Sequence, residues 1–208
     1  QLAGLGTLLA IQDVTAGHLV QTVADQDLFT RAYDDVMRLL RASLPATIEI
    51  KSKMYSKAVV LADPNQIYQV LMNLCGNGAQ AMQENGGVLS IDLMDVDFKK
   101  GDMAAYSDLK PGPHVCLLVQ DTGHGIDPAI MDRIFDPFFT AREAGTGTGL
   151  GLAVVHGIVS NLGGAILVDS RWGQGTAFQV YLPRLDDAGP GDIPEAVAPE
   201  PIAFSSKG

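Results

Sequence analysis

The stretch from Asp121 to Leu152 constrains this 208-residue chain more than any other part of it. Its sequence, DTGHGIDPAIMDRIFDPFFTAREAGTGTGLGL, contains an acidic strand end, an aromatic turn and a glycine-rich loop in that order. Apolar residues then recur at helical spacing up to Gly163, a residue type that commonly ends helices. This order predicts a ligand pocket walled by a strand end, a loop and the N-terminus of a helix.

The loop of this stretch carries a glycine at every second position, at Gly145, Gly147, Gly149 and Gly151. Glycines leave backbone N–H groups uncovered and adopt positive φ without strain. The helix that follows points the positive end of its dipole back at them, which favours an anionic group such as a phosphate. A glycine-rich loop is a weak signal alone, and the motifs around it give it weight. We interpret the stretch as a nucleotide pocket.

Composition excludes other classes of protein. The formal net charge of −10, with 14 Lys and Arg against 24 Asp and Glu, argues against a nucleic-acid groove, which needs clustered basic residues. No apolar run reaches the roughly 18 residues of a membrane span, and no secretory signal is recognisable. We therefore expect a cytoplasmic segment without membrane contact. Cys75 and Cys116 lie in apolar segments, which favours buried reduced thiols over a disulfide.

Hydrophobic periodicity predicts mixed α/β structure. Helices are expected at residues 27–42, 64–83 and 149–162, and strands at 47–54, 59–63, 87–98, 114–123, 165–170 and 176–183. Asp63 and Pro64 are a typical N-cap and first-turn pair for the second helix. Residues 1–26 are mostly small and apolar with moderate helical periodicity. Residues 185–208 are rich in Pro, Gly and acidic residues, which predicts a flexible tail.

The second predicted helix carries three amide side chains on one face, Gln69, Asn73 and Asn77, at spacings of four residues. Their neighbours on the helix are apolar, and a buried polar group without a partner costs about 1–3 kcal/mol. These amides therefore either bond to nearby backbone or water, or contact a ligand. The glycine-rich loop downstream makes us favour ligand contact.

Five motifs now carry a resemblance to a known family. The segments NLCGNGAQAM, DTGHGID, FDPFF, GTGTGLGL and GQGT follow one another in this chain. They resemble the N, G1, F, G2 and G3 boxes of the catalytic domain of sensor histidine kinases, in the ATPase superfamily shared with DNA gyrase B, Hsp90 and MutL. The resemblance implies a two-layer α/β sandwich, with a mixed five-stranded sheet packed on three helices and ATP bound under a mobile lid.

The resemblance also implies roles for individual residues. Asp121 resembles the carboxylate that accepts a hydrogen bond from the adenine amino group, and Asn77 resembles the ligand of Mg²⁺. Phe135, Phe138 and Phe139 resemble the residues that anchor the lid, although ordinary core packing explains them equally well. The full set of implied nucleotide contacts is Asn77, Asp121, Gly123, Gly125, Phe138, Gly147, Thr148, Gly149, Leu150, Gly151 and Thr176. Arg142 resembles a lid residue that contacts the γ-phosphate.

Asn73 separates the branches of this superfamily. ATP hydrolases of the superfamily commonly have a glutamate four residues before the metal-binding Asn, and an amide cannot take the proton of an attacking water. Hydrolysis is therefore disfavoured, whereas phosphoryl transfer, which relies on positioning and charge stabilisation, remains open. We expect Asn73 and Gln69 to act in the catalytic step by support and orientation.

The resemblance implies partners outside the catalytic domain: a helical hairpin carrying the phosphoacceptor histidine, and a response regulator receiver domain. Residues 1–26 are interpreted as a remnant of the hairpin or a linker, residues 27–184 as the catalytic domain and residues 185–208 as the tail. No acceptor motif surrounds His18, and His124 alone of the four histidines lies near the pocket motifs. The main prediction is a histidine kinase domain. A non-catalytic ATP-binding module and a gyrase-like ATPase remain alternatives.

Overall fold

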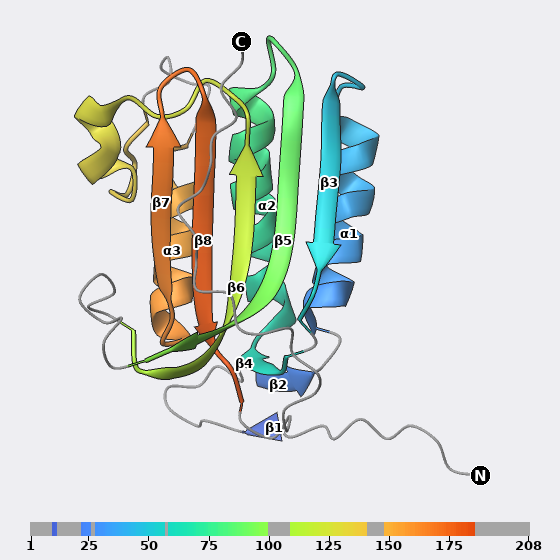
Figure 1. Cartoon of the computed structure of the whole chain (residues 1–208), viewed down its shortest axis with the longest axis vertical. Coiled ribbons are helices and arrows are strands. Elements are labelled where there is room, and N and C mark those ends of the chain that lie inside the picture. Colours follow the sequence, from blue (N-terminus) through green and yellow to red (C-terminus); the bar gives the residue numbers. More distant parts are fainter. Residues whose placement is uncertain are drawn as a thin grey trace.

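The protein forms two layers, a five-stranded sheet and three helices that cover one of its faces (Figure 1). The computed structural model describes residues 10–11, 22–25, 28–56, 58–99, 109–140 and 148–185. The helices are α1 (Leu28–Ser43), α2 (Pro64–Ala81) and α3 (Gly151–Asn161). The strands of the sheet are β3 (Ile48–Met54), β5 (Gly87–Phe98), β6 (Gly112–Asp121), β7 (Ala165–Arg171) and β8 (Gly175–Pro183). This confirms the predicted two-layer α/β sandwich.

The sheet is mixed, as predicted. Its strand order is β3-β5-β6-β8-β7, with β3 and β5 parallel and every other pair antiparallel. Parallel neighbours need a crossover connection, and α2 lies within the crossover from β3 to β5. The last strand, β8, lies between β6 and β7. The C-terminal ends of β6 and β7 and the N-terminal end of β8 therefore lie side by side at one end of the sheet, close to the segment that follows Asp121.

The helices begin and end within two residues of the predicted positions. In α2, the Asp63 carboxylate accepts a hydrogen bond from the Asn65 N–H at 2.8 Å, and Pro64 occupies the first turn. This cap satisfies a backbone donor that would otherwise have no partner. Helix α3 ends before Gly163, whose φ of 73° is the left-handed conformation that favours glycine after a helix.

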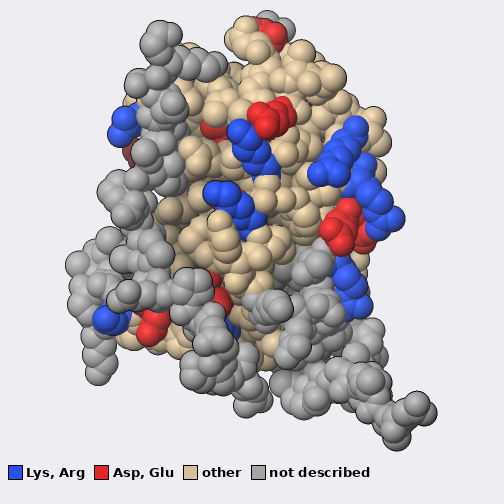
Figure 2. All heavy atoms as spheres, turned by 45° about the vertical axis from the view of Figure 1, so that its right-hand side comes forward, with Lys and Arg blue, Asp and Glu red and all other residues tan. Residues whose placement is uncertain are grey.

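Helix α1 is amphipathic and lies at the edge of the helical layer. Val36 and Leu40 face the sheet and are buried, while Asp35 and Arg38 form an exposed ion pair on the outer side. On the side of the molecule that carries α1 and β3, basic and acidic side chains lie beside one another (Figure 2). Exposed pairs of this kind contribute only about 0–1 kcal/mol. Within the described part of the chain, the basic side chains on this side are interrupted by acidic ones (Figure 2).

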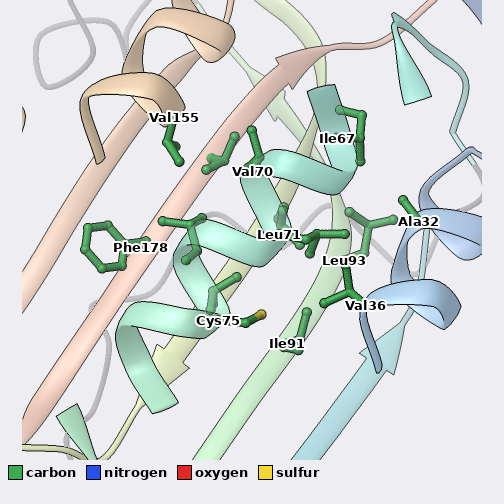
Figure 3. Packing of buried hydrophobic residues seen from close by; sticks show 14 of the residues in the cluster. Ala32, Val36, Ile67, Val70, Leu71, Cys75, Ile91, Leu93, Val155 and Phe178 are labelled. Carbon is green, nitrogen blue, oxygen red and sulfur yellow. The ribbon is translucent and has the colours of Figure 1, made fainter. Parts of the chain in front are cut away.

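The main core lies between the sheet and the helices (Figure 3). Cys75 lies near Ile91 of β5, Ile67 lies at the other end of α2 on the side of Ala32 and Leu93, and Phe178 of β8 lies on the opposite side of the helix in this view. Burying one aliphatic or aromatic side chain contributes about 1.5–3 kcal/mol. Helix α2 is at the centre of this core, so its apolar face fixes the helix on the sheet, while Gln69, Asn73 and Asn77 lie outside that buried face.

The two cysteines are buried and free, as predicted. Cys75 belongs to the main core, and Cys116 lies on the opposite face of the sheet in a smaller cluster with Phe98 and Tyr181. Burial raises the pKa of each thiol to about 12. Both thiols are therefore protonated and unreactive at neutral pH.

The predicted strand at residues 59–63 is present as β4 (Val60–Ala62), which pairs with β2 (Thr22–Asp25) in a separate small sheet that also holds β1 (Ala10–Ile11). Neither β1 nor β2 is predicted as a strand from the sequence. The segment after β6 contains a 3-10 helix, η2 (Pro128–Arg133), which is too short to give a recognisable hydrophobic period.

Most of residues 1–26 and nearly all of residues 185–208 lie outside the described residues. The interpretation of the first segment as a hairpin remnant and of the last as a tail therefore stays a prediction. Within the described part of the chain, none of the helices combines the length and the hydropathy needed to cross a membrane.

Candidate nucleotide-binding site

Four side chains form a row across the end of the sheet. Leu89 pairs with Asp121, Asp121 with Thr176, and Thr176 with Ser170, so β5, β6, β8 and β7 each contribute one residue. The residues two positions earlier on β6 and β7 belong to the core under the helices. Side chains alternate along a strand, so the whole row faces the helical layer. The row brings together two residues that the sequence predicts as adenine contacts.

Asp121 is a buried carboxylate in the middle of this row, with 4% of its surface exposed. Burial raises its pKa from the usual 3.8 to about 6, partly offset by the N–H groups of Gly123 and Thr176 and by His124. The Gly123 N–H donates to Asp121 Oδ1 at 2.8 Å. A carboxylate that is costly to bury and held by backbone donors is typical of a binding residue.

Helix α2 lies directly over Asp121 because Gly78 has no side chain. A Cβ atom on Gly78 would lie 3.1 Å from Asp121 Cβ and 3.4 Å from Asp121 Oδ2. The residue before Gly78 is Asn77, the predicted metal ligand, which is half-buried. Helix α2 thus contacts Asp121 of β6 at Gly78, and Asn77 is the adjacent residue of the helix. Sequence reasoning missed Gly78, although a glycine inside a helix is a signal of close packing.

The loop after β6 is wedged between α2 and the turn that joins β7 to β8. A Cβ atom on Gly123 would lie 2.6 Å from the Ala81 side chain, and one on Gly125 would lie 2.2 Å from the Arg171 carbonyl oxygen. Gly125 also has a φ of 72°. The Gly173 N–H donates to the His124 carbonyl at 2.7 Å, which ties the loop to the turn. These two glycines are required by packing, and the Gly123 N–H orients Asp121.

His124 lies at the rim of the site. Its side chain is exposed, its Nδ1 is 2.6 Å from the Gly125 carbonyl oxygen, and its ring centroid is 5.9 Å from that of Trp172. Of the other histidines, His114 is buried on the far side of the sheet in contact with Phe98. His18 lies outside the described residues.

Asn73 and the N-terminus of α3 face each other. The Asn73 amide nitrogen donates to the Gln69 carbonyl at 2.9 Å, and a Cβ atom on Gly151 would lie 2.9 Å from Asn73 Oδ1. Leu150, at the N-cap of α3, makes no side-chain capping bond. The first N–H groups of α3 therefore have no side-chain cap beside the amide-bearing face of α2. Gln69 is exposed and lies one turn farther along.

The aromatic turn packs against Gly149, near the end of the glycine-rich loop. A Cβ atom on Gly149 would lie 2.5 Å from the Phe138 carbonyl carbon, and Gly149 has a φ of 64°. The Thr148 hydroxyl accepts the Leu150 N–H at 3.4 Å. Phe138 has a φ of 65° and is 76% exposed. Gly149 therefore has to be glycine for packing reasons alone.

The three phenylalanines have different surroundings. Phe135 packs on the core and lies 5.5 Å from the ring of His156, which fits ordinary packing. The Arg133 guanidinium lies 4.4 Å over the Phe139 ring. The predicted lid and the contacts at Gly147 and Arg142 lie outside the described residues.

A known family of proteins matches more than half of this chain. Residues 62–186 match the profile of the family described as "Histidine kinase-, DNA gyrase B-, and HSP90-like ATPase", and the chain belongs to this family. Within the family, the chain is similar to sensor kinases. It is 43% identical over 126 residues to the sensor kinase CckA of Brucella abortus, covering 61% of this chain and 13% of that protein. It is 40% identical over 124 residues to the sensor histidine kinase ZraS of Escherichia coli K12, covering 60% of this chain and 23% of that protein.

Solved structures of sensor kinases have the same fold. A mycobacterial sensor histidine kinase, MprB, superposes with a TM-score of 0.58 at 25% identity, over 80% of this chain and 98% of that one. Full-length ShkA in complex with AMPPNP gives a TM-score of 0.58 at 26% identity, over 81% of this chain and 32% of that one. The chain spans less than a quarter of the length of CckA or ZraS. The resemblance to the catalytic domain of sensor histidine kinases and the predicted α/β sandwich are therefore confirmed.

Proposed function

We propose that this chain is the ATP- and Mg²⁺-binding catalytic part of a sensor histidine kinase, which transfers the γ-phosphoryl group of ATP to a histidine on a helical hairpin. The observation that carries the proposal is the buried carboxylate of Asp121, in register with Thr176 and directly under Gly78 of α2. Family membership, the similarity to sensor kinases and the AMPPNP complex of ShkA support it.

Asp121 and Thr176 are proposed to hold the adenine base. The ionised carboxylate accepts a hydrogen bond from the exocyclic amino group, whereas guanine presents an oxygen at that position and two facing acceptors repel. Gly125, which has no side chain, packs on the carbonyl oxygens of Arg171 and Gly175, the residue before Thr176. Selection of adenine then follows from one buried acceptor.

The phosphates are proposed to bind between α2 and the start of α3. The N–H groups of Gly149, Leu150 and Gly151 are the donors offered there, with Thr148 and Gly147 completing the loop. Helix α3 has no side-chain capping bond at Leu150, so its first turn is open to a phosphate, which would also take the Leu150 N–H from the Thr148 hydroxyl that accepts it at 3.4 Å. The Phe138 backbone packs against Gly149, and the Phe138 residue is exposed.

Asn77 is proposed as the protein ligand of Mg²⁺. Within the described residues, no group of three or more His, Cys, Asp or Glu could hold a metal ion alone. This donor set fits Mg²⁺ bound with ATP, because Mg²⁺ commonly takes one or two protein oxygens and fills its octahedron with phosphate oxygens and water. When bound, Mg²⁺ neutralises charge on the phosphates.

Transfer to a protein is proposed in preference to hydrolysis. Asn73 is held by the Gln69 carbonyl and turns its oxygen toward Gly151. An amide in this position orients groups by hydrogen bonding but cannot accept the proton of an attacking water. The proposed roles of Asn73 and Gln69 are therefore to position α2 and the phosphates. The acceptor hairpin and a downstream receiver domain are proposed as partners, with the segment working in the cytoplasm, where ATP is available.

The test is to incubate the chain with radiolabelled ATP and Mg²⁺, alone and with the acceptor hairpin of a related sensor kinase supplied in trans. Label on a hairpin histidine supports the proposal. ATP binding without transfer would support the alternative of a non-catalytic module that reports ATP to a partner. Steady release of inorganic phosphate would support the ATPase alternative, and no ATP binding at all would overturn every version of the proposal.

A further inference from the structure

Ser170 is a hydrogen-bonding hub at the end of the row, and none of the five sequence motifs includes it. Its hydroxyl accepts the Ile126 N–H at 2.8 Å and donates to the Gly175 carbonyl at 3.0 Å. It also lies 3.0 Å from the Thr176 hydroxyl. One side chain thus connects the loop after β6, the turn before β8 and the residue proposed to hold adenine.

The direction of the bond between Ser170 and Thr176 follows from counting protons. A serine hydroxyl has one proton, and a carbonyl oxygen can only accept. The Ser170 proton is used on the Gly175 carbonyl. The proton between the two hydroxyls must therefore come from Thr176, so the Thr176 hydroxyl is left with lone pairs and no proton for any other partner.

We propose that Ser170 is a positioning residue that keeps the Thr176 hydroxyl as a hydrogen-bond acceptor, and so determines specificity for the 6-amino group of the base. This inference rests on the proposed function. Asp121 is the neighbour of Thr176 in the row and also accepts when ionised. Two adjacent acceptors match the donor of adenine and repel the 6-oxo group of hypoxanthine or guanine.

Loss of the Ser170 hydroxyl frees the Thr176 proton. Thr176 can then rotate to donate to a 6-oxo group, so the penalty against inosine triphosphate falls while ATP loses part of its acceptor pair. Removing the hydroxyl also leaves the Ile126 N–H and the Gly175 carbonyl without this partner, which loosens the site in general. General loosening weakens both nucleotides alike, whereas the proton rearrangement changes their ratio.

The experiment measures the dissociation constants of ATP and inosine triphosphate, both with Mg²⁺, by calorimetry. For Ser170→Ala we expect the preference for ATP to fall by about tenfold, the scale of one misdirected hydrogen bond. Ser170→Thr restores the hydroxyl on a strand that favours β-branched residues, so it should restore the preference. If Ser170→Ala does not fold, Ser170→Cys keeps the volume but accepts poorly, and the same fall is expected.

Thr122→Val is the matched control. The Thr122 hydroxyl accepts the Val88 N–H at 2.9 Å and lies next to Asp121 in sequence, with no contact to Thr176 among the described hydrogen bonds. Its loss should lower stability and leave the nucleotide ratio unchanged. If the wild-type chain binds neither nucleotide, the proposed function fails. If it prefers ATP and the Ser170 variants keep the same preference within twofold, only the role of Ser170 is overturned.

Discussion

Replacing Asp121 by Asn should stabilise the free protein and weaken ATP binding. The carboxyl is buried, and its pKa is raised from 3.8 to about 6 by that burial. One pKa unit corresponds to about 1.4 kcal/mol, so ionised Asp121 costs the folded state about 3 kcal/mol at pH 8. The amide of Asn is neutral and keeps one oxygen for the Gly123 N–H, which removes most of that cost.

The magnitude follows from the backbone donors around the carboxylate. The Thr176 N–H also bonds to Asp121, and a poorer bond to the amide costs about 1 kcal/mol. The net gain expected for Asp121→Asn is about 1–2 kcal/mol at pH 8. A hydrogen bond from the adenine amino group to a charged acceptor is worth about 1.5–3 kcal/mol, so ATP affinity should fall by about 10- to 150-fold.

The pH dependence has a definite sign. The folded pKa of Asp121 is raised, so the native state binds more protons than the unfolded chain between pH 4 and pH 6. The stability linked to this group is complete below about pH 4 and is lost as the pH rises through 6. The advantage of Asp121→Asn should therefore vanish near pH 4 and reach its full value above pH 6.

Urea unfolding at pH 4, 6 and 8 measures the stability term, and calorimetric titration with ATP at pH 8 measures the binding term. Asp169→Asn is the control, since Asp169 is an exposed carboxylate on β7 and its change should affect neither quantity. A variant at Asp121 that is less stable than wild type at pH 8, or that binds ATP with unchanged affinity, would refute the reasoning.

Three further predictions concern metal binding, backbone strain and a buried ion pair. Asn77→Ala should weaken ATP binding by about 5- to 30-fold in Mg²⁺ but much less in EDTA, measured by calorimetry in both buffers. Gly125→Ala should lower the free energy of unfolding in urea by at least about 2 kcal/mol, because Gly125 has a positive φ and contacts backbone atoms. Gly76 lies in open space on α2, so Gly76→Ala should leave the free energy of unfolding unchanged or raise it by up to about 1 kcal/mol. Equal effects of the two substitutions would contradict the strain argument. Arg184→Ala should cost about 2–3 kcal/mol in urea unfolding, since Asp95, 3.2 Å away and 17% exposed, loses its cation, and a change below 0.5 kcal/mol would count against it.

Much of the site could be read from the order of short motifs. The motif order predicts that Asp121 ends a strand beside the glycine-rich loop, and the four-residue spacing of Gln69, Asn73 and Asn77 predicts a shared helix face. Helix signals such as Asp63 and its proline act within one turn, so local sequence is enough to locate them. The family assignment rested on these motifs and is confirmed by the match over residues 62–186.

The contribution of Ser170 and of Gly78 could not be read in this way. Ser170 and Thr176 face each other across the β7–β8 hairpin, but Ser170 also accepts the Ile126 N–H, 44 positions earlier in the chain, and that contact depends on long-range packing of the loop after β6. Gly78 matters because α2 crosses Asp121 at that residue, 43 positions before it in the chain. Local spacing predicts neither the contact of Ser170 with Ile126 nor that of Gly78 with Asp121.

The amino-acid sequence by itself therefore determined the elements, their buried faces and the types of donor and acceptor available for a nucleotide. Tertiary structure alone decided which of these groups touch, how far Asp121 is withdrawn from water, and where the proton of Thr176 is directed. The physical reason is that periodicity and capping act over a few residues, whereas desolvation and hydrogen-bond direction depend on every element that packs around a group.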